Sequence, residues 1–379
     1  MSMFIFLPHC SFCSVHNVDS FFADLYSIMP DYVHPVLHKS ILTLLAELEL
    51  APEDPPMQKV IPFPRYPVPA GYPLAHPSVS PVPPTLTFWT FPAHSMNEPS
   101  QKAKTTGHKP HLMGTLNATP DSFSDGSTHN TLHTALAYAR GAVSAGASII
   151  DVGGYSTRPG ATFVEVEEEV ERVVPIIRAM RQPSLPAEDE DGRDEGSVLQ
   201  AEGAKKEDGL VGLWDMPISI DTFRWDVARA AILAGANCIN DVYAFTGPDS
   251  YPYPPPRDNG KYAEESMGEM KRVAREFAVP VVLMHSRGDA AMNKDYGVYD
   301  YASVGRKIGG GAVIEGVQVE LGQKVDHIIM GKGGVRRWFV IVDPGIGFSK
   351  SLEGNLEVLR GAKQITAHVD VGQGKFKEF

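Results

Sequence analysis

Downstream of about residue 106, short apolar runs of strand length alternate with longer segments whose apolar residues recur every three or four positions. The runs are typical of strands buried on both faces, and the recurring spacing is typical of helices with one apolar face. The predicted strands are 111–117, 148–153, 217–222, 238–242, 280–285 and 339–345. The predicted inward helix positions are Leu132, Ala135, Ala139, Val143, Phe163, Val166, Val170, Val173, Ile177, Met267, Met270, Val273, Phe277, Val313, Val317, Leu321, Val325 and Ile328. This alternation predicts parallel strands with right-handed helical crossovers, as in a β/α barrel or a doubly wound sheet.

Polar residues at the strand ends favour the barrel. Each predicted strand ends in, or just before, a polar group: Asn117, Asp151, Asp221, Asn240 with Asp241, His285 and Asp343. In a β/α barrel the carboxyl ends of the strands form one mouth, where such groups can meet around a small molecule. Taken singly, each is more often a loop or helix-cap residue. No Gly-x-Gly-x-x-Gly opening follows the first strand, so we predict an α/β fold of the TIM type.

The chain divides into three parts by composition. Residues 51–97 carry 13 of the 31 prolines, which predicts an extended linker over 51–105 without helix or sheet. An amino-terminal segment, 1–50, precedes this linker, and the predicted barrel domain occupies 106–379. The stretch 183–212 is longer than the barrel needs and is interpreted as an acidic surface insertion.

Charge and cysteine content exclude several classes of function. The net charge is −12, but residues 188–208 alone hold nine acidic and three basic residues, which is typical of a solvated loop. No basic stripe indicates nucleic acid, and no apolar run approaches the roughly 20 residues of a membrane span. Three cysteines fit a reducing compartment, so we expect an intracellular protein, cytoplasmic or mitochondrial.

Six motifs carry a resemblance to a known family. Residues 113–126 read Met-Gly-Thr-Leu-Asn-Ala-Thr-Pro-Asp-Ser-Phe-Ser-Asp-Gly, and residues 151–160 read Asp-Val-Gly-Gly-Tyr-Ser-Thr-Arg-Pro-Gly. Ile-Asp-Thr at 220–222, Ile-Asn-Asp-Val at 239–242, Leu-Met-His at 283–285 and Asp-Pro-Gly-Ile-Gly-Phe at 343–348 follow in order. Together they resemble the ordered signatures of dihydropteroate synthases, over residues 106 to about 362.

The resemblance implies a reaction and a magnesium ion. In it, the amine of 4-aminobenzoate displaces pyrophosphate from 6-hydroxymethyl-7,8-dihydropterin diphosphate in folate biosynthesis. Asn117 would hold Mg²⁺, because a neutral amide oxygen suits a hard cation that keeps several waters. Thr157 and Arg158 would bind the diphosphate. An Asx-turn role for Asn117 and a solvated surface role for Arg158 are the alternatives.

The same resemblance assigns the remaining site residues. Asp221, Asn240 and Asp343 would bind the polar edge of the pterin, with a helix cap as the alternative role for each. Met284 and Phe348 would pack on its flat face, unless they only fill the core. The two loops over 4-aminobenzoate would include Phe123, Asp125 and Pro159. No residue is assigned as a general acid or base.

The sequence also departs from that family. Dihydropteroate synthases continue into a seventh and an eighth strand with further signatures, and no such strand is found in 363–379. We therefore expect a carboxy-terminally truncated barrel with about six of eight β/α units, and little or no activity. Upstream, residues 30–35 and 40–41 resemble the end of the hydroxymethyldihydropterin pyrophosphokinase that precedes the synthase in fused fungal proteins.

Two other functions are consistent with these residues. A pterin-binding methyltransferase domain has the same barrel and strand-end residues, although it is not expected to carry both loop motifs. A non-catalytic pterin-binding protein would bind the ligand without turnover. Barrel synthases often pair through their outer helices, so a homodimer is also expected.

Overall fold

A computed structural model describes the barrel strands, their helices and a hairpin that precedes them. The described residues are 33, 37–40, 43–44, 58–70, 83–92, 110–118, 130–158, 160–182, 212–248, 251, 257–297, 311–330, 333–365, 369–370 and 376–377. Phe123, Asp125 and Pro159 lie outside these ranges, as do most of the amino-terminal segment and residues 183–211 of the acidic insertion.

Six parallel strands form the central sheet, and all six were predicted from the sequence. They pair in the order β3-β4-β5-β6-β7-β8. Their bounds are β3 (Met113–Asn117), β4 (Ile149–Gly153), β5 (Ile218–Asp221), β6 (Cys238–Asp241), β7 (Val281–Met284) and β8 (Val340–Asp343). β4 is buried at all five positions, as predicted for a strand covered on both faces. That prediction was wrong for the two edge strands, because only Leu116 of β3 is buried and β8 is half-buried throughout.

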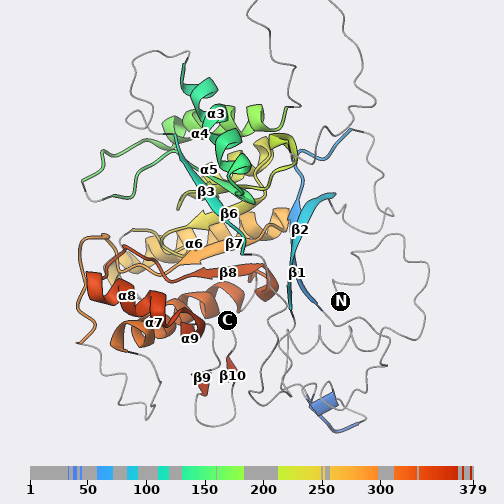
Figure 1. The fold of residues 1–379 in the computed structure, drawn as a ribbon. Helices are drawn as coiled ribbons and strands as arrows, with labels where there is room; N and C mark the ends of the chain where they lie inside the picture. The colour runs from blue at the N-terminus through green and yellow to red at the C-terminus, as the bar shows by residue number, and fades with distance from the viewer. Residues whose placement is uncertain are drawn as a thin grey trace, which may run out of the picture.

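Helices connect successive strands and cover the sheet. They are α3 (Asn130–Ser144), α4 (Val166–Met180), α5 (Trp225–Ala234), α6 (Arg257–Phe277), α7 (Ala312–Ile329), α8 (Leu352–Arg360) and α9 (Ala362–Ile365). Short 3-10 turns at Leu213–Asp215 and Arg337–Phe339 lead into β5 and β8, and β9 (Val369–Asp370) pairs with β10 (Phe376–Lys377). Figure 1 shows α3, α4 and α5 grouped at one end of the molecule and α7, α8 and α9 at the other, with the sheet between them.

The strand order identifies the fold class. A doubly wound sheet reverses direction at a switch point, whereas here every strand is added on the same side of the one before it. Successive right-handed crossovers in one direction curl a sheet into a β/α barrel. The predicted TIM-type class is therefore confirmed. Within the described residues the sheet is an open arc, because β3 and β8 do not pair with each other.

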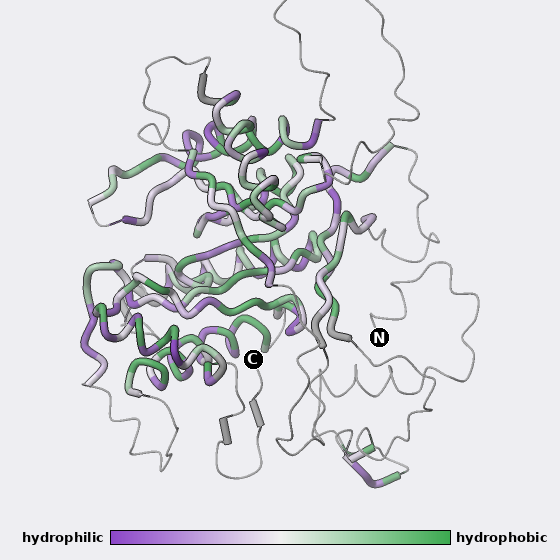
Figure 2. Tube along the Cα trace, in the orientation of Figure 1, coloured by the Kyte–Doolittle hydropathy of each residue, from purple (hydrophilic) through white to green (hydrophobic). Residues whose placement is uncertain are grey.

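Apolar helix faces pack against the strands as the spacing predicts. The five predicted positions of α7, from Val313 to Ile328, are all buried, and so are Val173 and Ile177 of α4. In Figure 2 the helices alternate between hydrophobic and hydrophilic colour along their length, as amphipathic helices do. Two predicted inward positions are exposed instead. Phe163, 65% exposed, precedes α4, which begins only at Val166, and Leu132, 39% exposed, lies in the first turn of α3.

A β-hairpin lies in the segment predicted to be an extended linker. Strand β1 (Gln58–Pro64) pairs antiparallel with β2 (Thr85–Pro92), and Figure 1 shows this hairpin standing against one end of the sheet. Ile61 and Phe63 are buried against Ile149, Cys238 and Val282, at or near the first residues of their strands. The hairpin therefore covers the amino ends of the barrel strands.

The absence of sheet predicted for this segment was wrong for residues 58–64 and 85–92. Proline content was a poor guide because a two-stranded ribbon has an outer edge on each strand, where a missing N–H breaks no ladder bond. The β-branched and aromatic residues of this segment, such as Val60, Ile61 and Phe63, were the signal for a strand.

Two hydrogen bonds attach the hairpin segment to the barrel. Tyr66 Oη donates to Phe277 O at 2.8 Å, and Asn237 Nδ2 donates to Pro64 O.

None of the helices in the described part of the chain combines the length and apolar character needed to cross a bilayer.

We predict that Phe63→Ala destabilises the barrel, because it leaves a cavity where a fully buried ring contacts the strand ends. The free energy of unfolding should fall by about 3–5 kcal/mol in urea titrations. Phe88→Ala is the matched control, since Phe88 lies on the same hairpin but is 58% exposed. Its effect should stay within about 0.5 kcal/mol. If Phe63→Ala lowers the free energy of unfolding as little as Phe88→Ala does, the hairpin is not part of the folded unit.

Candidate active site

Parallel pairing aligns the predicted polar residues at one end of the sheet. Asp221 lies opposite Asn240 in the β5–β6 register, and Met284 lies opposite Asp343 in the β7–β8 register. Asn117 ends β3, and Ala118 N donates to Gly153 O at 2.7 Å, which extends the β3–β4 pairing past Asn117. These residues therefore line the carboxyl-end mouth of the barrel.

Asp151 joins this group although it was not assigned to the site. It lies on β4, is only 4% exposed, and accepts a 2.9 Å hydrogen bond on Oδ2 from Asn240 Nδ2. This bond fixes which end of the Asn240 amide is engaged by the protein and leaves Asn240 Oδ1 as the acceptor available at the mouth. Its position at a strand end was noted from sequence, but nothing there indicated the contact with a residue 89 positions away.

The three aspartates form a cluster in which negative charge is costly. Burial raises the pKa of Asp151, and the nearby Asp343 raises it further. Burial also raises the pKa of Asp221 well above its usual range, with Asp151 and Asp241 adding to the rise. The pKa of Asp343 is raised by burial as well. A ligand that brings several N–H donors would stabilise the ionised forms, so the site favours a nitrogen-rich polar edge.

An apolar wall lies beside the carboxylates. Met284 is buried in one cluster with Phe223, Val242 and Tyr243, and Phe348 packs against that cluster while remaining partly exposed. The structure thus brings the predicted Met284 and Phe348 together at the mouth. A half-exposed aromatic ring next to polar acceptors can contact the face of a flat heterocycle.

The loop after β4 is held by its neighbours. Arg172 Nη1 donates to Gly154 O at 2.8 Å, and the Arg224 guanidinium lies 4.8 Å from the centre of the Tyr155 ring. Arg224 is fixed in turn by buried Glu169, which accepts from it at 2.9 Å and from Thr222 Oγ1 at 2.7 Å. The loop that follows Tyr155 therefore starts from a rigid base.

Asn117, Thr157 and Arg158 lie at the rim. Thr157 is half-buried, whereas Arg158 and Asn117 are exposed. In the described part of the chain, none of the three hydrogen-bonds to the carboxylate cluster. The interior of the mouth is thus lined by carboxylates. Its rim carries the cationic side chain of Arg158 and the hydroxyl group of Thr157. Among the described residues there is no cluster of three or more His, Cys, Asp or Glu side chains that could hold a metal ion by itself.

Just after the carboxyl end of β7, a buried charged network connects the chain to α7. His285 Nε2 lies 2.8 Å from Glu320 Oε2, and Arg287 donates to both carboxylate oxygens of Glu320, at 2.9 and 2.7 Å. Burial lowers the pKa of His285 to about 4, and Lys350 contributes to the lowering. The hydrogen bonds from His285 and Arg287 outweigh burial and lower the pKa of Glu320 to about 2. The histidine is therefore neutral at pH 7 and donates from Nε2.

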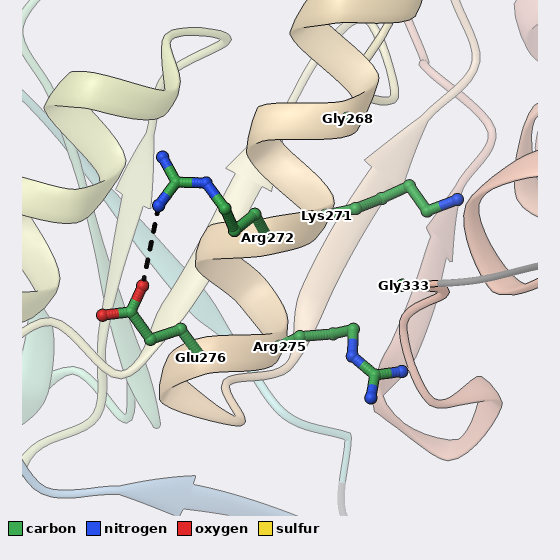
Figure 3. A pocket seen from close by; sticks show the side chains of 6 residues that line it. All are labelled: Gly268, Lys271, Arg272, Arg275, Glu276 and Gly333. Carbon is green, nitrogen blue, oxygen red and sulfur yellow. Dashed lines mark ion pairs between the residues drawn. The ribbon is translucent and has the colours of Figure 1, made fainter.

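A surface pocket of about 440 Å³ lies at the opposite end of the barrel. Figure 3 shows it between α6, with Lys271, Arg272 and Arg275, and Gly333. Because α6 runs antiparallel to the strands, its last turns lie at their amino ends. Lys271 Nζ donates to His327 O at 2.9 Å and Arg275 Nη1 to Gly334 O at 2.6 Å, so these cations are engaged by the protein. None of the predicted site residues lines this pocket.

Comparison with known proteins identifies relatives of the described barrel. A family model described as pterin binding enzyme matches residues 113–187 and 208–373. A dihydropteroate synthase of Synechocystis is 37% identical over 254 residues, which cover 67% of this chain and 66% of the relative. One from Streptococcus pyogenes serotype M1 is 34% identical over 254 residues, covering 67% of this chain and 70% of the relative. The chain thus spans about two thirds of the length of these curated relatives.

One solved structure illustrates the similarity. Xanthomonas albilineans dihydropteroate synthase with 4-aminobenzoic acid is 33% identical, and the match covers 68% of this chain and 69% of that one, with a TM-score of 0.45.

We predict that the His285–Glu320 pair makes the protein sensitive to acid. Unfolded chains protonate histidine below pH 6.5, whereas folded His285 is protonated only near pH 4, so the free energy of unfolding should fall as pH drops from 6.5 to 4. The loss should reach at most about 3 kcal/mol. Glu320 adds a further loss as pH falls from 4.5 towards 2.

His285→Gln tests this assignment, because glutamine keeps a donor for Glu320 but cannot be protonated. Urea unfolding at several pH values should show a much smaller loss between pH 6.5 and 4 in the variant than in the wild type. An unchanged loss would mean that another group with a different proton affinity in the folded and unfolded states between pH 6.5 and 4 is responsible.

Proposed function

The chain belongs to the pterin-binding enzyme family, and we propose that its site is that of a dihydropteroate synthase. The observation that carries the proposal is the cluster of Asp221, Asn240 and Asp343 at aligned strand ends, beside the apolar wall of Met284 and Phe348. Its substrates would be 6-hydroxymethyl-7,8-dihydropterin diphosphate and 4-aminobenzoate. The products would be dihydropteroate and pyrophosphate.

The acceptor groups of the site would recognise the N–H donors of the pterin. Asp221 and Asp343 would accept from the amino group and ring N–H groups of the aminopyrimidinone, and such paired bonds to a carboxylate are strong and directional. Asn240 Oδ1 would add one more acceptor, because Asp151 engages the other end of the amide. Met284 and Phe348 would contact the flat face of the ring. A pterin has many donors on one edge, so it matches the raised pKa values of these aspartates.

The rim would bind the diphosphate. Arg158 would donate to its oxygens in a bidentate manner, and Thr157 would donate a hydroxyl hydrogen bond. Asn117 would hold Mg²⁺ through its amide oxygen. Its exposed side chain makes no hydrogen bond to the described residues, and Mg²⁺ commonly takes only one or two protein ligands beside substrate phosphates and water. The ion would neutralise charge on the departing pyrophosphate.

The reaction depends on how the two substrates are positioned and needs no general acid or base residue. The nitrogen lone pair of 4-aminobenzoate attacks the methylene carbon of the pterin, the new C–N bond forms, and the C–O bond to the diphosphate breaks with its electrons. The amine then loses one proton to solvent. Phe123, Asp125 and Pro159, which lie outside the described residues, would belong to the loops over 4-aminobenzoate and exclude water.

A second function, pterin binding without turnover, is favoured by one observation. Strands β3 and β8 are not joined in the described part of the chain, so the mouth is open on one side there. Isothermal titration with 6-hydroxymethylpterin and an assay of dihydropteroate formation with Mg²⁺ separate the two functions. Binding with turnover supports the synthase, and binding alone supports the second function. Absence of both excludes a pterin site.

Two expectations accompany the proposal. The location would be cytoplasmic or mitochondrial, and two copies would pair through outer helices. Analytical ultracentrifugation would show whether the chain is a dimer.

We predict that Asp343→Asn weakens pterin binding. Asn retains an oxygen for Gly345 N, which donates to Asp343 Oδ1 at 2.8 Å, but it removes the charge that pairs with ligand N–H groups. Affinity for 6-hydroxymethylpterin should fall by roughly 10–100-fold in titration calorimetry. Asp226→Asn, an exposed aspartate in the first turn of α5, is the control and should leave affinity unchanged. Equal affinities of Asp343→Asn and wild type would remove Asp343 from the site.

We predict that Arg158→Ala affects the diphosphate selectively. Affinity for the pterin diphosphate should fall about 10-fold or more, while affinity for 6-hydroxymethylpterin, which lacks the phosphates, should not change. Arg178→Ala, at an exposed position near the end of α4, should alter neither affinity. A loss that is equal for both ligands would indicate a general structural effect of Arg158 instead.

A further inference from the structure

A buried lysine outside the proposed ligand set holds the turn that carries two of its members. Lys350 is only 3% exposed. Its Nζ lies 3.1 Å from His285 Nδ1, 3.0 Å from Gly345 O and 3.0 Å from Phe348 O. An ammonium group has three N–H donors, so all of them are used within the protein. Lys350 is therefore an internal tether and not a ligand group.

The contacts with Glu320 and Arg287 determine which ring nitrogen of His285 accepts a hydrogen bond. Because His285 Nε2 donates to Glu320, the Nδ1 atom of the neutral ring carries a lone pair that accepts from Lys350. Arg287 holds Glu320 with two hydrogen bonds, and Arg287 Nη1 also donates to Asp295 O at 2.9 Å. A continuous chain of contacts thus runs from α7, through the residue after β7, to the turn after β8.

That turn is tight and closely packed. His285 N donates to Asp343 O at 2.8 Å, and Phe348 N donates to Gly345 O at 3.1 Å. Gly345 has a φ of +69°, and a Cβ atom there would lie 2.1 Å from His285 O, so only glycine fits. Lys350 binds two carbonyl oxygens of this turn, one at Gly345 and one at Phe348.

We propose that Lys350 is a positioning residue that fixes the 343–348 turn and thereby sets the directions of Asp343 and Phe348 toward the pterin. The proposal rests on the proposed function. Burying an amine is costly, and an apolar side chain would fill the same space without that cost. Each hydrogen bond of Lys350 goes to this turn or to the network that supports it.

The test compares Lys350→Met with wild type. Methionine keeps the length and the packing of the side chain but removes all three donors. Amide hydrogen exchange of peptides covering 343–350 should accelerate about 10-fold or more, because two hydrogen bonds within the turn and one to His285 are lost. Exchange over 218–221 should not change. Affinity for 6-hydroxymethylpterin should fall by about 10-fold or more.

The control is Lys271→Met, a half-buried lysine that donates to His327 O at the other end of the barrel. It should change neither turn exchange nor affinity. Unchanged exchange over 343–350 in Lys350→Met, or faster exchange with unchanged affinity, would overturn the proposal. If Lys350→Met does not fold, Lys350→Gln, which keeps two donors, is measured by the same criteria. If wild type itself binds no pterin, the proposed function fails, and exchange alone then decides whether Lys350 holds the turn.

Discussion

The in-register parallel pairing of β3 to β8 is the constraint on which the site depends. It places Gly153, Asp221 and Asn240 side by side at the same level of the sheet, and Met284 beside Asp343. Since side chains alternate between faces, a shift of one residue in any pair would turn that strand's polar end away from the mouth. The core that fixes this register is apolar on both sides, so the energy that aligns the site comes from residues that never contact a ligand.

Sequence predicted the features that arise from local pattern. Strand number, the face of α7 and the strand-end acceptors were all visible, because each is encoded by spacing over a few residues. The hairpin at 58–64 and 85–92 was missed, because the proline content of this segment was taken to exclude a sheet. Whether the strand-end residues bind the proposed ligand stays a prediction.

Contacts between distant residues were not predictable. Asp151 meets Asn240 across 89 positions, and Lys350 meets His285 across 65. One signal was present: Glu320 and Lys324 lie three and seven positions after Val317, so they fall on the inward face of α7 among apolar residues. Charged residues at inward positions indicate buried partners, but sequence alone does not identify which partners they meet.

The open arc has a consequence for how copies of this chain can associate. Within the described residues, β3 and β8 each have one edge without a strand neighbour, and such edges can pair with another chain. The two edges belong to opposite ends of the same arc, so β8 of one copy would meet β3 of the next in the parallel direction. That contact is head-to-tail, and a head-to-tail contact closes only if its rotation divides a full turn.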